Sequence, residues 1–163
     1  MTLDEFFLSI EEANARIPGL HTTHPGATPA QIEPWQRERG IDLPADLVEL
    51  LRRSDGVGLK QDWYEGEPLF HEGAFRIYPL REITPAAKAI FGMRDGEEAP
   101  YPEYASWLVI GMGPESALYI VFDTRERIYL TVNAILLDEV QRLGPLIGPL
   151  LDILDPINPY WAV

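Results

Sequence analysis

Apolar side chains recur at helical spacing at the start of the chain. Leu3, Phe6, Phe7, Ile10 and Ile17 mark one face of a predicted helix, which Pro18-Gly19 ends. Thr2 and Glu5 occupy the two positions of an N-terminal capping box. A loop over residues 20–26 is expected to follow, exposed to solvent and holding two histidines.

Two further helices are predicted between residues 28 and 56. Thr28, Pro29 and Gln31 form a helix-start signal, and Gly40 supplies the stop. Ile32 and Trp35 share a face of this helix and are expected to be core. The next helix begins at Pro44 and ends before Asp55-Gly56. Its apolar face is predicted to hold Leu47, Val48, Leu50 and Leu51, and its polar face Asp46, Glu49, Arg52 and Arg53.

The second half of the chain reads mainly as strands. Residues 75–78 alternate as a strand, and Thr84-Pro85 begins a short helix that Gly92 ends. Residues 107–110, 118–122 and 128–132 predict an antiparallel meander. Aliphatic residues between 136 and 154 stand at helical spacing, so two short helices are expected there, broken by Gly-Pro pairs. This order of segments permits an α+β fold with helices packed on one side of a small, mostly antiparallel sheet.

The same residues carry a family resemblance. A capped helix TPAQIEPWQRERG is followed by IDLPADLVELLRRSDGVG, with an aliphatic-x-Leu-Pro step, a second helix and a Gly-containing turn. This pattern resembles the SUKH (Smi/Knr-like) superfamily, and the strands at 107–112 and 118–123 look like its central hairpin. The resemblance covers roughly residues 27–155 and implies the α+β fold. It also implies a protein that binds other proteins, above all a bacterial immunity protein that neutralises a toxin.

Length and composition narrow the function classes. At 163 residues the chain is expected to be one domain, with an N-terminal helix and loop (1–26), the SUKH-like core (27–155) and a C-terminal tail (156–163). Its formal net charge of −13 disfavours nucleic acid and anionic membranes and favours basic partners. The absence of cysteine excludes disulfides and thiolate sites. We expect neither a signal peptide nor a membrane span, and a cytoplasmic protein.

Motifs for catalysis and cofactors lack the context that they require. His21 and His24 could pair on a metal, but no carboxylate stands close to them in the sequence. Gly111-Met112-Gly113 leads into a strand rather than a helix, so a dinucleotide loop is excluded, and neither Ser54 nor Ser116 lies in a hydrolase motif. We therefore expect no cofactor, no metal and no enzyme activity. A carboxylate-dependent hydrolase using Glu65 with Glu67, or Glu97 with Glu98, stays open as an alternative.

Two acidic segments combine charge with aromatic side chains. Residues 62–72 and 94–104 together carry seven of the 13 excess negative charges. Aromatic side chains anchor protein interfaces, and clustered charge steers an oppositely charged partner. The predicted partner-binding residues are Asp62, Trp63, Tyr64, Glu65, Glu67, Glu97, Glu98, Tyr101 and Tyr104. The alternative is structural: the aromatic rings seal the edge of the core and the acids keep the protein soluble.

The expected function is therefore non-catalytic protein binding. The family resemblance makes an immunity protein the first expectation, and the charge points to a basic toxin domain as its partner. A regulatory scaffold of the Smi/Knr type is the second expectation.

Overall fold

The computed structural model describes residues 1–60, 63–64, 67–68, 75–94, 97, 102–113 and 117–156, with 63–64 and 67–68 described by their backbone. The helices there are α1 (Leu3–Arg16), α2 (Pro29–Arg39), α3 (Ala45–Arg53), α4 (Ala86–Ala89), α5 (Gly148–Ile153) and the 3-10 turns η1 (Leu80–Glu82) and η2 (Pro102–Tyr104). The strands are β1 (Thr22–Thr23), β2 (Val57–Gly58), β3 (Trp63–Tyr64), β4 (Glu67–Pro68), β5 (Arg76–Ile77), β6 (Thr84–Pro85), β7 (Trp107–Met112), β8 (Leu118–Asp123), β9 (Ile128–Asn133) and β10 (Val140–Gly144).

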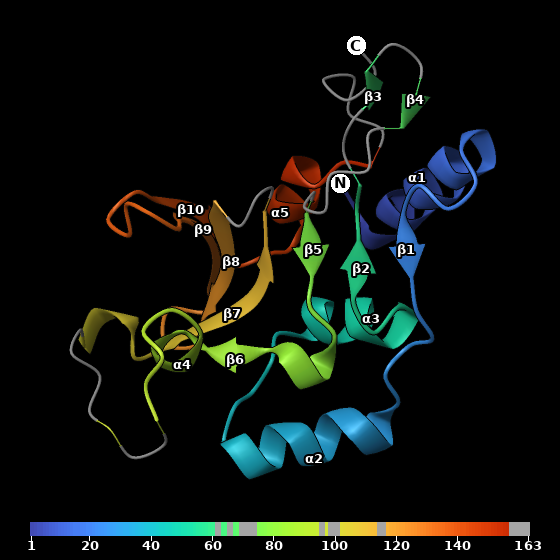
Figure 1. The fold of residues 1–163 in the computed structure, drawn as a ribbon. Helices are drawn as coiled ribbons and strands as arrows, with labels where there is room; N and C mark the ends of the chain where they lie inside the picture. The colour runs from blue at the N-terminus through green and yellow to red at the C-terminus, as the bar shows by residue number, and fades with distance from the viewer. Residues whose placement is uncertain are drawn as a thin grey trace.

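Eight of these strands form one sheet (Figure 1). Their order is β1-β2-β5-β7-β8-β9-β10, with β6 paired to β7 beside this path. Every strand pair in the described part of the chain is antiparallel. The predicted α+β fold is confirmed. No helix among the described residues is long and apolar enough to cross a bilayer.

The predicted meander is the centre of this sheet. β7 pairs with β8 and β8 with β9, and Val121 is opposite Val109 on one side and Leu130 on the other. Asp123 makes the tight turn into β9, since its carboxylate accepts from the backbone N–H groups of Arg125 and Glu126 at 2.9 and 3.2 Å. A short polar side chain that binds the backbone two and three residues ahead is typical of such turns.

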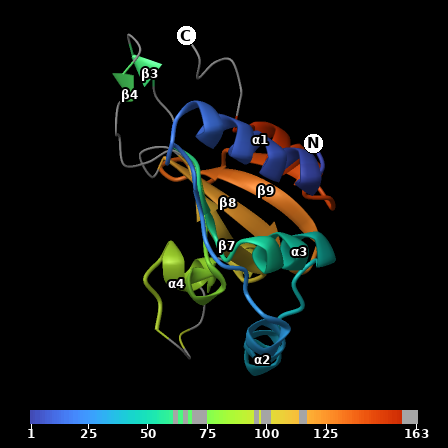
Figure 2. The same ribbon diagram turned by 90° about the vertical axis from the view of Figure 1, so that its right-hand side faces the viewer.

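Helices cover both faces of the sheet (Figure 2). On one face, α1, α3 and α5 pack on Leu108, Ile110, Ile120 and Phe122. On the other face, Ala86 and Ile90 of the α4 region pack on Val109, Val121, Leu130 and Val132. The α4 region therefore lies on the face opposite to the larger helices, whereas the sequence predicted helices on one side.

The helix boundaries follow the predicted caps. Thr2 and Glu5 bind each other's backbone N–H groups reciprocally, at 3.2 and 2.7 Å. Gln31 accepts a hydrogen bond from the backbone N–H of Thr28 at 2.8 Å, and Gly40 ends α2 in the left-handed conformation, with φ of 61°. Trp35, predicted to be core, is 6% exposed.

One predicted helix is a strand. Residues 140–144 form β10 instead of the first of two short helices, and only the second, α5, is present. The reason lies at Asn133, whose side-chain oxygen accepts from the backbone N–H groups of Ile135 and Leu136 at 2.8 and 2.9 Å. This turn sends the chain back along β9, and pairing with a preformed strand overrides the helical spacing of the aliphatic residues.

The predicted exposed loop at 20–26 also differs from expectation. His21 is only 3% exposed. Asn14 of α1 binds the backbone of His21 on both sides, accepting from its N–H at 2.7 Å and donating to its carbonyl at 3.1 Å. Sequence pattern cannot show such contacts, because they join segments that the chain brings together only in the fold. Of the predicted C-terminal tail, 156–163, only Pro156 is among the described residues.

Candidate protein-binding surfaces

The first acidic segment contains a short β-hairpin. Trp63 pairs with Pro68 and Tyr64 with Glu67, in a two-stranded sheet that is separate from the main one. Asp62 and Glu65 lie outside the described residues. The backbones of Trp63, Tyr64 and Glu67 therefore all belong to this hairpin.

The second acidic segment is fixed to the sheet by Tyr104. Its ring stacks on Phe91 with centroids 5.5 Å apart and contacts Trp107 at 4.7 Å. Tyr104 is half-buried against the cluster that α4 covers. Glu97 is exposed, and its carboxylate accepts from the backbone N–H of Arg94 at 3.0 Å. Glu98 and Tyr101 lie outside the described residues.

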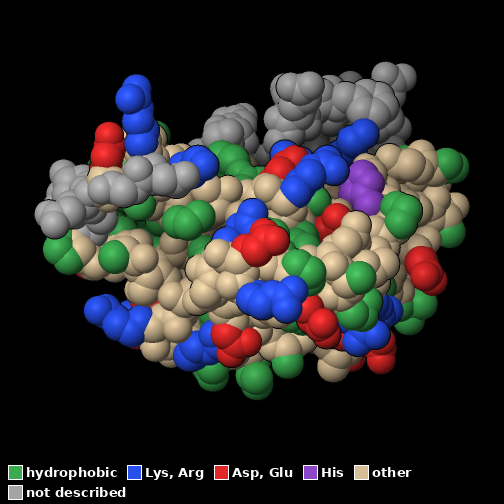
Figure 3. Space-filling model, turned by 90° about the horizontal axis from the view of Figure 1, so that it is seen from below, with side chains coloured by type: hydrophobic (Ala, Val, Ile, Leu, Met, Phe, Trp, Pro, Cys, Tyr) green, Lys and Arg blue, Asp and Glu red, His purple; other side chains and the backbone are tan. Residues whose placement is uncertain are grey.

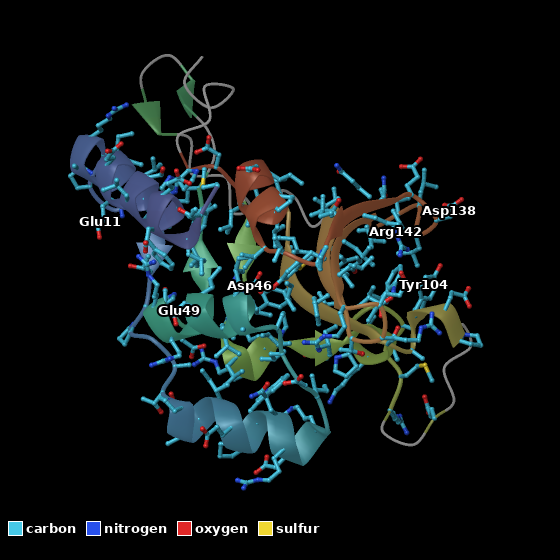
Figure 4. The ribbon with its side chains drawn as sticks, turned by 180° about the vertical axis from the view of Figure 1, so that it is seen from behind. Glu11, Asp46, Glu49, Tyr104, Asp138 and Arg142 are labelled. Carbon is cyan, nitrogen blue, oxygen red and sulfur yellow. The ribbon has the colours of Figure 1, made fainter. Side chains whose placement is uncertain are left out.

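The two acidic segments do not form one continuous surface among the described residues. The hairpin β3–β4 lies beyond the ends of α1 and α5, while η2 and its Tyr104 lie beside α4 at another end of the molecule (Figures 1 and 4). Tyr104 also has a clear structural role, because it packs on the core. That these nine residues bind a partner remains a prediction. The described residues among them belong to two separate surfaces.

Between α2 and α4 the surface is hollowed into a groove of about 640 Å³. Four basic side chains line it, namely Arg39, Arg81, Lys88 and Arg94, together with Glu38 and Glu97. Arg39 also lies over the ring of Trp35, 4.6 Å from its centroid, which fixes this side of the groove to the core. On the α2 side of the molecule, Lys and Arg are interspersed with Asp and Glu (Figure 3), so the excess of acids is not spread evenly.

Asp46 is the polar residue that the sequence placed on the wrong face of its helix. Its carboxylate accepts from the Tyr129 hydroxyl at 2.6 Å and from the Ile147 backbone N–H at 2.7 Å. It thereby joins α3, β9 and the start of α5, whereas Glu49, one turn later, is exposed (Figure 4). Burial, with this hydrogen bond as the second cause, raises the pKa of Tyr129 well above its usual range. The sequence indicates only that Asp is favourable in the first turn of a helix. It does not indicate whether the side chain points to solvent or to the core, because the preference holds in either case.

This network has a clear structural role. The Tyr129 ring is fully buried, and its hydroxyl donates to Asp46, which is only partly buried. Among the residues that the structure describes, no three His, Asp or Glu side chains gather in a way that could hold a metal ion.

His21 is a second buried polar residue that joins distant segments. Its Nδ1 accepts from the Lys60 backbone N–H at 3.3 Å, so Nε2 carries the proton and donates to the Pro156 carbonyl at 3.1 Å. Burial lowers the pKa of His21, and the bond to Pro156 opposes this only in part. His21 therefore joins Lys60, two residues before the first acidic segment, to the end of the described C-terminal region as a neutral side chain.

Comparison with protein families identifies this architecture. The profile of the SMI1 / KNR4 family (SUKH-1) matches residues 26–140, from the loop before α2 to the first residue of β10. The chain belongs to the SMI1 / KNR4 family. A search of curated proteins finds no match. The sequence resemblance to the SUKH superfamily is thus confirmed. The match includes both acidic segments and Asp46, while α1, α5 and nearly all of β10 lie outside it.

Proposed function

We infer that this SMI1 / KNR4-family chain is a non-catalytic protein-binding module, and specifically an immunity protein that covers a bacterial toxin in the cytoplasm. The observation that carries the proposal is a family domain whose acidic excess lies mostly in two short segments. Family membership supports an immunity-type or Smi/Knr-type protein. The toxin as partner is our proposal from the charge.

Charge gives a physical reason for a basic partner. Glu103 is exposed and directly precedes Tyr104, whose ring contacts Trp107 of the sheet, so its charge is presented from a fixed base; Glu97 is also exposed. Charges held in place on a surface raise the rate at which an oppositely charged protein finds it, and salt weakens the effect. A nuclease domain would suit this surface, because its substrate site is built to attract phosphate charge.

Affinity capture tests the proposal. The chain serves as bait in a lysate of the source organism at low and moderate salt, and bound proteins are identified by mass spectrometry. We expect one basic protein, above all the C-terminal toxin domain of a larger secreted protein, held more firmly at low salt. A housekeeping partner would instead favour a regulatory scaffold. Turnover of a substrate that Glu97→Gln with Glu98→Gln abolishes would favour a carboxylate hydrolase.

A further inference from the structure

Exposed apolar side chains are concentrated along the last strand of the sheet and the residues that flank it. Five large hydrophobic side chains are exposed among the described residues, and four of them lie between 135 and 146. They are Ile135, Leu136, Val140 and Leu146, which are 84%, 49%, 36% and 67% exposed. Single exposed apolar residues are ordinary, but a gathered set marks an interaction surface. We call residues 135–146 the β10 edge.

The backbone of the β10 edge offers free hydrogen-bonding groups. Within the described part of the chain, β10 is the last strand of the sheet and pairs with β9 on one side only. Asn133 donates to the Glu139 carbonyl at 3.1 Å, which makes this pair a hydrogen-bonded pair of the antiparallel ladder. Since such pairs alternate along a ladder, the next is Thr131 with Gln141. The backbone N–H and C=O of Val140 and Arg142 therefore point away from β9.

The charges on the β10 edge favour a basic occupant. Asp138 and Glu139 are exposed beside the strand, and Arg142 is paired with Glu126 (Figure 4). The local surface is therefore acidic apart from that ion pair. A second copy of the chain would bring the same acids and another net charge of −13 to this edge, which opposes self-pairing.

We propose that the β10 edge binds an extended segment of a partner protein as an added strand, a segment in which apolar residues alternate with lysine or arginine. Main-chain hydrogen bonds to Val140 and Arg142 supply the pairing, and the exposed aliphatic side chains and acids select the sequence. The inference goes beyond the proposed function, because this surface lies outside both acidic segments and does not require that the partner be a toxin.

A synthetic peptide tests the inference on the whole chain. The probe is a nine-residue peptide in which lysine alternates with valine, titrated while amide signals are followed by NMR. The control peptide has proline in place of each valine; it keeps the charge but cannot pair as a strand. We expect the probe to shift the amide signals of Val140 and Arg142, and the control to leave them in place.

Two variants of one residue separate strand pairing from charge attraction. Arg142→Pro and Arg142→Gln both remove the ion pair with Glu126, but only proline also removes the outward N–H. We expect the probe to bind Arg142→Pro at least about ten-fold more weakly than Arg142→Gln, or about 1.4 kcal/mol.

If Arg142→Pro does not fold, a second set of variants tests the inference instead. Ile135→Ser with Leu146→Ser should weaken binding several-fold, whereas Leu8→Ser, the fifth exposed residue, on α1, should not. Equal binding by the two Arg142 variants, equal binding of both peptides, or no binding at all would overturn the inference. So would a dimer of the free chain that Arg142→Pro dissolves, since it would make a second copy the occupant. Because the probe is a defined peptide, these outcomes do not depend on whether a toxin is found.

Discussion

Neighbouring strands β9 and β10 have opposite environments. Four of the six residues of β9 are buried, and none of the five residues of β10 is. β9 lies between the two hydrophobic clusters and is tied by Tyr129 to Asp46 of α3, while no strand among the described residues lies on the outer side of β10. The difference separates the part of the sheet that stabilises the fold from the part that is available for recognition.

The largest loss of stability is expected where a buried aromatic ring is removed from the covered region. Trp35→Ala should lower the free energy of unfolding by about 3–5 kcal/mol, because the ring is packed in the core beneath Arg39. Denaturant unfolding followed by circular dichroism measures the change. A loss below about 1 kcal/mol would mean that Trp35 does not contribute to the core as its burial indicates.

The next largest effect compares two acids on one helix. Asp46→Ala should cost about 2–3 kcal/mol, because the Tyr129 hydroxyl and the Ile147 N–H both lose their acceptor. Glu49→Ala is the matched control and should change stability by less than about 0.5 kcal/mol, since Glu49 is exposed and its carboxylate lies 3.8 Å from the Arg52 guanidinium. The same unfolding assay applies, and equal losses in the two variants would contradict the role given to Asp46.

A smaller effect is expected in the pH dependence of stability. The folded state lowers the pKa of His21, so below about pH 6.5 the unfolded chain takes up a proton that the folded chain resists. The contribution of His21 is therefore present above pH 6.5 and is lost as pH falls. We expect stability to fall more between pH 7 and 5 in the original chain than in His21→Asn. Equal slopes in the two proteins would contradict this role of His21.

Local signals made the helices predictable, and long-range contacts decided the rest. The caps at Thr2 and Thr28 and the turn at Asp123 each depend on residues two or three positions away, so the sequence contained the whole interaction. β10 was predicted as helix because its aliphatic spacing fits a helix and its partner strand is invisible to a periodicity argument.

The candidate binding surfaces were likewise only partly predictable from the sequence, because they also depend on long-range contacts. Charge and aromatic content selected both acidic segments, yet only the fold shows that Tyr104 packs on Trp107 and that the segments lie apart. Asp46 and His21 were misplaced because their partners, Tyr129 and Pro156, are more than 80 residues away in sequence. The β10 edge could not be found at all without the sheet order.

The central claim, that acidic segments steer a basic protein to this fold, is tested most directly by association rates. With the captured partner, rates are measured by stopped flow at low and moderate salt for Glu97→Lys with Glu98→Lys, and for Glu65→Lys with Glu67→Lys. Glu11→Lys with Glu12→Lys, on exposed positions of α1, is the control with the same change in charge. The account predicts that at least one acidic-segment pair slows association about ten-fold or more and weakens its salt dependence, beyond what the control does. Equal effects of all three pairs would show that only net charge matters and would contradict the claim.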